Sequence, residues 1–180
     1  AHDLSLTDNR EVQSIEIESG ANLSFSGAET LDIRDNGSIT NNGTFNANNG
    51  TVNFLANGSI FGTLSLNDVV LNNGGVSFGT TCTITGNLTL NAGSFVNTNS
   101  PIYASSSTLI YNAGSTVGAP YQRRSEWSNA DPQGTPYNVI LQNNTAVNLG
   151  FERKTFDAIM KGDLTIDAGS FMLMDFGSDD

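Results

Sequence analysis

Pairs of apolar residues separated by one position, each followed by a short polar stretch and a Gly or Asn, recur about eight times along the chain. Residues two apart share one face of a β-strand, so each phrase predicts a short strand with one buried face. The phrases begin 16, 21, 17, 19, 21, 30 and 25 residues apart, and a spacing near 20 is typical of a solenoid of stacked coils. Their first residues are Ile15, Leu31, Val52, Val69, Leu88, Leu109, Val139 and Leu164.

This repeat predicts an all-β fold, a right-handed parallel β-helix (β-solenoid) of about eight coils with one long inserted loop. Stacking coils about 4.8 Å apart would align equivalent residues in ladders. We expect one such inward ladder at Leu31, Val52, Val69, Leu88 and Leu109. Because the repeat crosses the whole chain without a linker, residues 1–180 are predicted to form a single domain.

An antiparallel sandwich or roll is the alternative fold, since Asn-Gly pairs also make the turns of β-hairpins. Two observations favour the solenoid. The phrase runs in one direction at a near-constant period, and residues 86–95 (GNLTLNAGSF) recur at 162–171 as GDLTIDAGSF. In a solenoid the Asn-Gly pairs would supply positive φ at the corners. The predicted corners are Asn36-Gly37, Asn42-Gly43, Asn49-Gly50, Asn57-Gly58 and Asn73-Gly74.

The chain is acidic, with a net charge of −11 and a pI near 4.2. This charge argues against binding to nucleic acid, which needs clustered Lys and Arg. No apolar run approaches the roughly 20 residues of a membrane span, so none is expected. Cys82 alternates with Thr and is predicted to be a small buried filler, and His2 is the sole histidine. The sequence therefore predicts no metal site and no cofactor.

The regular spacing fails between Tyr111 and Val139, where residues 119–137 form the predicted inserted loop. This segment holds three of the four prolines, the only Trp and two adjacent arginines. We expect it to bulge from the rod, where solenoids commonly carry functional groups. A second irregularity at 151–161 contains much of the remaining positive charge.

The inserted loop supplies the ligand-contact candidates, because aromatic rings stack on pyranose C–H groups while charged groups fix hydroxyls or a uronate. The alternative is that Trp127 and Tyr121 fold back onto the rod, with Arg123 or Arg124 paired to Glu126 or Asp131. Acidic residues elsewhere are mostly dispersed, so the sequence favours a non-enzymatic protein and assigns no catalytic residue. The candidates are Tyr121, Arg123, Arg124, Glu126, Trp127, Asp131 and Tyr137.

Three segments carry a resemblance to a known group of proteins: 86–95 (GNLTLNAGSF), 121–127 (YQRRSEW) and 136–145 (PYNVILQNNT). They resemble the large secreted or cell-surface β-helical repeat proteins of Bacteroidota that are exported by the type IX secretion system. The resemblance implies secretion or display on the cell surface of a Gram-negative bacterium. It also implies a piece of a longer repeat protein, with more coils beyond residue 180; an apolar last coil at 171–176 agrees with an open end.

The leading functional hypothesis is a non-enzymatic exported structural or adhesive β-solenoid module of the cell surface. Its expected ligand is a polysaccharide or a surface protein, contacted through residues 119–137. One alternative is a carbohydrate-binding or polysaccharide-degrading β-helix protein. Another is cargo, or an associated component, of the secretion machinery itself.

Overall fold

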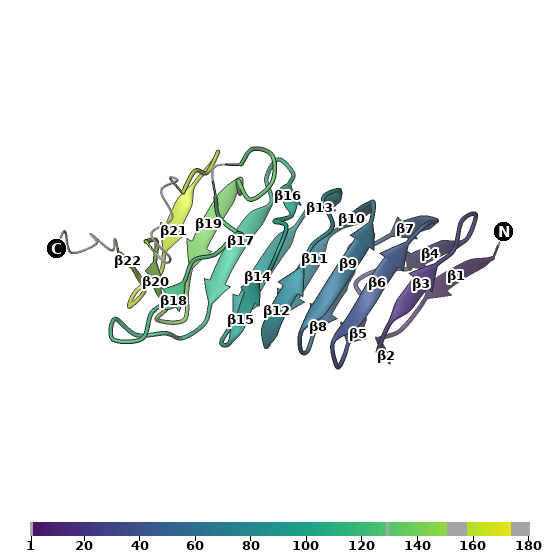
Figure 1. Cartoon of the computed structure of the whole chain (residues 1–180), viewed down its shortest axis with the longest axis horizontal. Coiled ribbons are helices and arrows are strands. Elements are labelled where there is room, and N and C mark those ends of the chain that lie inside the picture. Colours follow the sequence, from purple (N-terminus) through teal and green to yellow (C-terminus); the bar gives the residue numbers. More distant parts are fainter. Residues whose placement is uncertain (1, 129, 151–157, 174–180) are drawn as a thin grey trace.

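The computed structural model describes residues 2–128, 130–150 and 158–173 as a rod of stacked strands (Figure 1). These residues are all-β without a helix, and their strands stack in parallel as a β-solenoid of about eight turns. The predicted fold class is therefore confirmed over the hairpin-based alternative. Within the same three ranges, no helix is long and apolar enough to cross a membrane.

The strands lie on three faces of the rod. The first face is an eight-stranded sheet of β2 (Arg10–Val12), β5 (Thr30–Ile33), β8 (Thr51–Phe54), β11 (Asp68–Leu71), β14 (Asn87–Asn91), β17 (Thr108–Asn112), β19 (Asn138–Leu141) and β21 (Leu164–Ile166). Five strands that follow in their coils form the second face: β3 (Ile15–Ile17), β6 (Gly37–Asn41), β9 (Gly58–Gly62), β12 (Gly74–Ser77) and β15 (Ser94–Val96). In the last three coils the strands that follow the first face form a separate sheet of β18 (Tyr121–Gln122), β20 (Ala146–Asn148) and β22 (Phe171–Leu173).

The third face is divided into two three-stranded sheets. One contains β1 (Asp3–Leu6), β4 (Asn22–Phe25) and β7 (Thr44–Asn46), and the other contains β10 (Leu64–Leu66), β13 (Cys82–Ile84) and β16 (Ile102–Tyr103). The first face continues through these same coils without a break, and the second does so as far as β15. The division between β7 and β10 is therefore a local feature of one face.

The strand register confirms the predicted inward ladder. Leu31 pairs with Val52, which pairs with Val69, and the row continues to Leu88 and Leu109. All five side chains are buried, because successive residues of a strand point to opposite faces and these point inward. The rod thus has one continuous apolar core.

The predicted first phrase lies on a different face from the other seven. Ile15 pairs with Ile39 on the second face, whereas Arg10 is the residue that pairs with Leu31. The reason is that a coil has several strands with the same alternation, and alternation alone does not say which face a strand joins. Cys82 is buried, as predicted for a small side chain that fills space in the core. Burial raises the pKa of its thiol to about 12.

The explanation of the Asn-Gly corners by positive φ was right at only two of five pairs. Asn36 and Gly74 have φ of 59° and 82°, but the other three pairs have no positive φ. Glycine is needed there for space instead: a Cβ at Gly50 would collide with the ring of Phe25. Tight stacking of coils, rather than backbone conformation, fixes these glycines.

The segment 119–137, called the inserted segment below, does not bulge as a whole from the rod. Tyr121 and Gln122 form β18 and pair in parallel with β20. Further along, Gln133 makes an antiparallel bridge to Ile102, and the Gly134 N–H donates a hydrogen bond of 2.9 Å to Pro101. The segment docks on the rod because Tyr121 and Trp127 are buried there. Of the second irregularity, 151–157 lie outside the described residues.

Candidate functional site

The inserted segment builds a buried cluster of polar and aromatic side chains in the interior of the rod. Four of its side chains are buried: Tyr121 at the start of β18, and Arg123, Glu126 and Trp127 just after that strand. Glu126 is fully inaccessible to solvent. Tyr111 from β17 lies against this group, with its ring 5.1 Å from that of Tyr121 in an edge-to-face arrangement. The inserted segment thus supplies core, as in the alternative in which Tyr121 and Trp127 fold back onto the rod, and these two rings do not form the expected contact surface.

Glu126 is the polar centre of the cluster. Its Oε1 accepts hydrogen bonds from the Tyr111 hydroxyl at 3.1 Å and from the Arg124 N–H at 2.9 Å. Its Oε2 and the Tyr121 hydroxyl are buried and have no hydrogen-bond partner among the described residues. Burial raises the pKa of Glu126, although these hydrogen bonds and the charge of Arg123 oppose the rise.

Burial also dominates the titration of the neighbouring phenols. It raises the pKa of Tyr103, Tyr111 and Tyr121 well above the usual value, and the charge of Glu126 adds to the effect. The Tyr103 hydroxyl donates to the Glu126 carbonyl at 2.9 Å. The three phenols therefore stay neutral around one carboxyl group.

Arg123 and Trp127 connect the cluster to the following coils. The Arg123 guanidinium donates to the carbonyls of Leu149 at 2.9 Å and of Trp127 at 2.6 Å. The Trp127 indole N–H donates to the Ile159 carbonyl at 3.0 Å. These hydrogen bonds hold the inserted segment against the following coils. The indole ring and the Tyr121 ring are both buried, so neither is exposed for stacking on a sugar.

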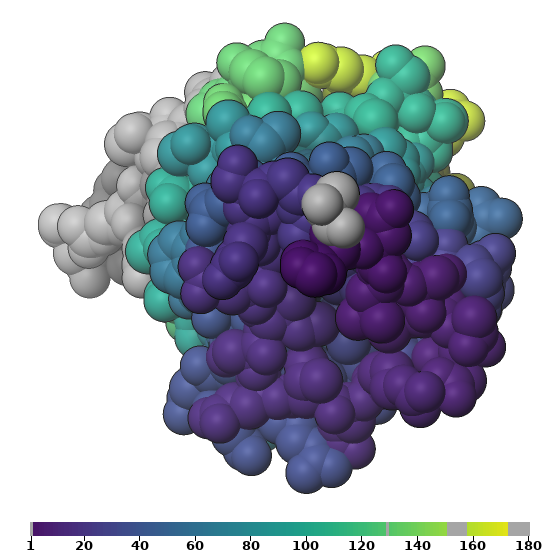
Figure 2. Space-filling model, turned by 90° about the vertical axis from the view of Figure 1, so that its right-hand side faces the viewer, coloured from purple at the N-terminus to yellow at the C-terminus, as the bar shows by residue number. Residues whose placement is uncertain are grey.

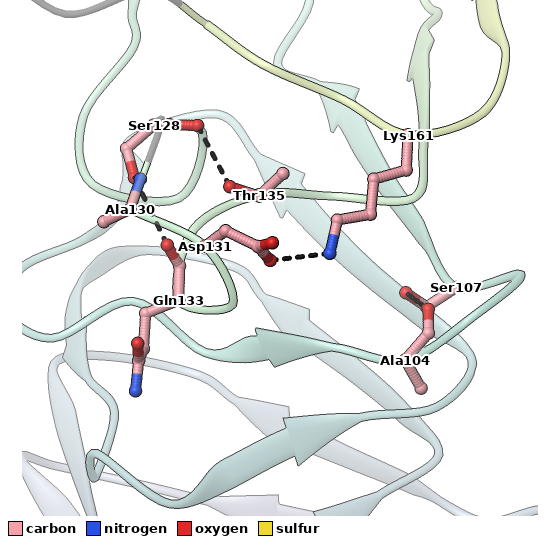
Figure 3. Close-up of polar contacts among 8 residues, drawn as sticks. All are labelled: Ala104, Ser107, Ser128, Ala130, Asp131, Gln133, Thr135 and Lys161. Atoms are coloured by element: carbon pink, nitrogen blue, oxygen red, sulfur yellow. Dashed lines mark hydrogen bonds and ion pairs between the residues drawn. The ribbon is translucent and has the colours of Figure 1, made fainter.

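The remaining predicted residues lie nearer the surface but do not converge on one site. Asp131 is exposed and pairs with Lys161 at 2.6 Å, a partner that the sequence did not indicate (Figure 3). The Arg124 guanidinium lies over the ring of Phe95 at 4.1 Å, and Tyr137 is half-buried. The structure thus buries four of the seven candidates together inside the rod, while the side chains of Arg124, Asp131 and Tyr137 are more exposed.

Hydrogen bonds hold the tip of the inserted segment against the coils. The Thr135 hydroxyl donates to the Ser128 carbonyl at 3.4 Å, as Figure 3 shows. Gln133 reaches further and donates from its side chain to the Thr80 carbonyl at 3.2 Å. The segment therefore spans several coils on the third face.

A ladder of side-chain hydrogen bonds runs along the outside of the eight-stranded sheet. Each amide donates to the side chain of the preceding coil, as Asn91 does to Asn72 at 2.8 Å and Asn112 does to Asn91 at 2.7 Å. At the end of the row Gln142 donates to Asn112 at 3.2 Å. This amide ladder consists of Asp32, Asn53, Asn72, Asn91, Asn112 and Gln142.

A small polar cleft on the third face was not predicted from the sequence. The cleft has a volume of about 200 Å³ and lies where β7 and β10 are not paired. The corner before β8 spans four residues, 47–50, while the corner before β11 is Asn67 alone. Because the two neighbouring corners differ in length, the ends of β7 and β10 are offset and do not pair. The only sequence signal is the short interval from Val52 to Val69. The polar cleft is lined by Phe45, Asn46, Ala47, Asn48, Ser65, Asn67 and Thr85.

A larger hollow of about 450 Å³ occurs at the N-terminal end of the rod, which faces the viewer in Figure 2. Its lining is mainly apolar and includes Leu4, Leu6, Val12 and Ile15. Neither hollow has a group of metal ligands: within the described ranges there is no set of three His, Cys, Asp or Glu side chains placed to hold an ion.

Comparison of the chain with protein-family models, with curated proteins and with solved structures finds no match.

Proposed function

We propose that this chain is a non-enzymatic structural and adhesive module of an exported cell-surface protein. The observation that carries the proposal is the amide ladder, in which outward polar side chains bind one coil to the next along the rod. Polar groups committed in this way stiffen a scaffold, because a substitution in one coil is felt by two neighbours. The resemblance of segments 86–95, 121–127 and 136–145 to secreted repeat proteins supports the proposal of export.

The docking of the inserted segment on the rod supports the same structural role. Its buried residues add contacts between the sixth, seventh and eighth coils, as Trp127 does through Ile159 and Arg123 through Leu149. Solenoids gain stability from interfaces between adjacent repeats, so these contacts reinforce the rod where its period is interrupted.

The outer face of the middle coils suits contact with an uncharged surface. Outward residues of β11, β14, β17 and β19 are Thr, Asn, Val and Ile, with Asp68 as the one charged residue among them. This is a low density of charge for a protein of net charge −11. Interface cores are depleted of charge in the same way.

Surface labelling and adhesion test this proposal. Antibodies against the purified rod should label intact cells of the source bacterium, and beads coated with the rod should adhere to immobilised polysaccharide more than beads coated with albumin. Labelling that requires permeabilised cells would contradict export. Release of soluble sugars from polysaccharide by the purified protein would contradict the non-enzymatic role.

A further inference from the structure

We propose that the polar cleft between β7 and β10 is a binding site for one sugar residue of an uncharged glycan. The inference rests on the proposed adhesive function and gives it a contact site. It replaces the inserted segment as the contact surface, because the Tyr121 and Trp127 rings of that segment are buried.

The cleft exists because the third face is interrupted. β7 pairs with β4 and β10 pairs with β13, but there is no ladder between β7 and β10. Strand edges that face each other without pairing offer backbone N–H and C=O groups to a ligand. The end of β7 and the first half of the corner that follows it line one side of the cleft with residues 45–48, and the later coils contribute Ser65, Asn67 and Thr85.

The lining matches the chemistry of a sugar. Asn46, Asn48 and Asn67 carry amides with both donors and acceptors, which a sugar hydroxyl needs because it is itself a donor and an acceptor. Ser65 and Thr85 add hydroxyl groups at exposed positions. The buried lining residues, Phe45 and Ala47, form an apolar floor for the C–H face of the ring.

The same lining disfavours charged ligands. Its seven residues include no Lys, Arg or His to neutralise a phosphate, sulfate or uronate, and the net charge of −11 repels anions. They also include no carboxylate, which hard cations such as Ca²⁺ require among their oxygen ligands. A volume of about 200 Å³ is below that of most drug-sized pockets, so a single sugar ring fits the space better than a larger ligand.

Several side chains of the cleft are already fixed, which lowers the entropic cost of binding. The Asn46 amide donates to Asn22 at 3.1 Å, and the Thr85 hydroxyl donates to the Leu66 carbonyl at 3.1 Å. Asn48 has a φ of 45° and donates from its side chain to the Phe25 carbonyl. Ser65 and Asn67 make no side-chain hydrogen bond within the described part of the chain, so their polar groups remain for a ligand.

The test is calorimetric titration of the purified protein with defined oligosaccharides. The probes are the neutral hexasaccharides of cellulose, xylan, mannan, laminarin and chitin, with hexagalacturonate as the acidic comparator. Ser65→Phe should fill the cleft from an exposed position of β10 without entering the core. Asn67→Ala removes one amide and serves as a milder second variant. Thr40→Phe adds the same ring on β6 of another face and is the matched control.

We expect at least one neutral hexasaccharide to bind the parent protein more tightly than hexagalacturonate. Ser65→Phe should weaken that binding at least tenfold, Asn67→Ala should weaken it several-fold, and Thr40→Phe should leave it unchanged, with circular dichroism confirming that each variant is folded. Absence of binding by every neutral probe, preference for the acidic probe, or equal affinity of Ser65→Phe and the parent would overturn the assignment.

Bead adhesion separates this inference from the proposed function. If beads coated with Ser65→Phe adhere as well as parent beads, the cleft is not the contact site although the adhesive role stands. If parent beads do not adhere while the free protein binds a hexasaccharide, the cleft stands and the adhesive role fails.

Discussion

The Tyr111 hydroxyl donates a hydrogen bond of 3.1 Å to the Glu126 carboxyl group in the interior of the rod. Tyr111 belongs to the repeating β17, whereas Glu126 belongs to the inserted segment. The contact therefore joins the regular solenoid to the one place where its period is interrupted. It also makes the attachment of the inserted segment sensitive to the protonation of a single group.

Glu126 should make the stability of the rod depend on pH. Burial raises its pKa in the folded state, so the folded protein binds a proton that the unfolded chain releases near its ordinary value of 4.5. The contribution of Glu126 is complete below that value and is lost as pH rises through the higher folded pKa. Glu126→Gln should remove this loss. Urea unfolding across pH 4 to 9 should show the variant gaining stability relative to the parent as pH rises, and a constant difference would contradict the assignment.

Trp127→Ala should destabilise the rod by about 3–5 kcal/mol, because it removes a buried ring and the hydrogen bond to Ile159. Phe61→Ala is the control: this ring on β9 is 53% exposed, and its removal should change the free energy of unfolding by about 0.5 kcal/mol or less. Urea denaturation measures both. Equal effects of the two substitutions would mean that Trp127 is not part of the core.

Asn91→Ala should cost about 1–2 kcal/mol of unfolding free energy, because Asn91 donates to Asn72 and accepts from Asn112. Thr89→Ala, two residues earlier on the outer side of β14, is the matched control, since Thr89 has no side-chain hydrogen bond among the described residues. Its effect should be about 0.5 kcal/mol or less. If the two variants are equally stable, the amide ladder does not reinforce the stack.

Gly50→Ala should destabilise the protein by about 1–3 kcal/mol, because the added methyl group meets the ring of Phe25. A Cβ added at Gly118 would meet no atom within 4 Å, so Gly118→Ala should leave the stability nearly unchanged. Thermal unfolding of the two variants distinguishes close packing from backbone conformation as the reason for Gly50. If Gly50→Ala does not lower the stability, close packing against Phe25 is not the reason for glycine at this position.

The inward ladder could be predicted from sequence because each of its coils has aliphatic residues two positions apart that pack on those of the next coil. Leu31 to Leu109 followed that rule. Ile15 did not, because the strands of the second face obey the same alternation. Register between faces depends on corner lengths, and no local pattern reports them.

The candidate site was predicted less well, for a physical reason. Tyr121, Glu126 and Trp127 were identified by their chemistry, but a Trp among charged residues is equally consistent with a binding surface and with a core. Only the position of Tyr103 and Tyr111 decides between them, since these phenols provide the interior that covers the segment. The polar cleft was missed because it arises from the difference in length between neighbouring corners, while its residues are ordinary surface Asn, Ser and Thr.

Cysteine cross-linking across the inserted segment tests the stacked-coil account most directly. Ile110 and Ile140 are 30 residues apart in sequence and face each other as partners in β17 and β19. In a Cys82→Ala background, Ile110→Cys with Ile140→Cys should form a disulfide readily under mild oxidation, because parallel neighbours lie within disulfide range. Ile110→Cys with Gln142→Cys, displaced by two residues, should form it much less. Equal yields in the two pairs, or a higher yield in the displaced pair, would contradict the parallel register on which the account depends.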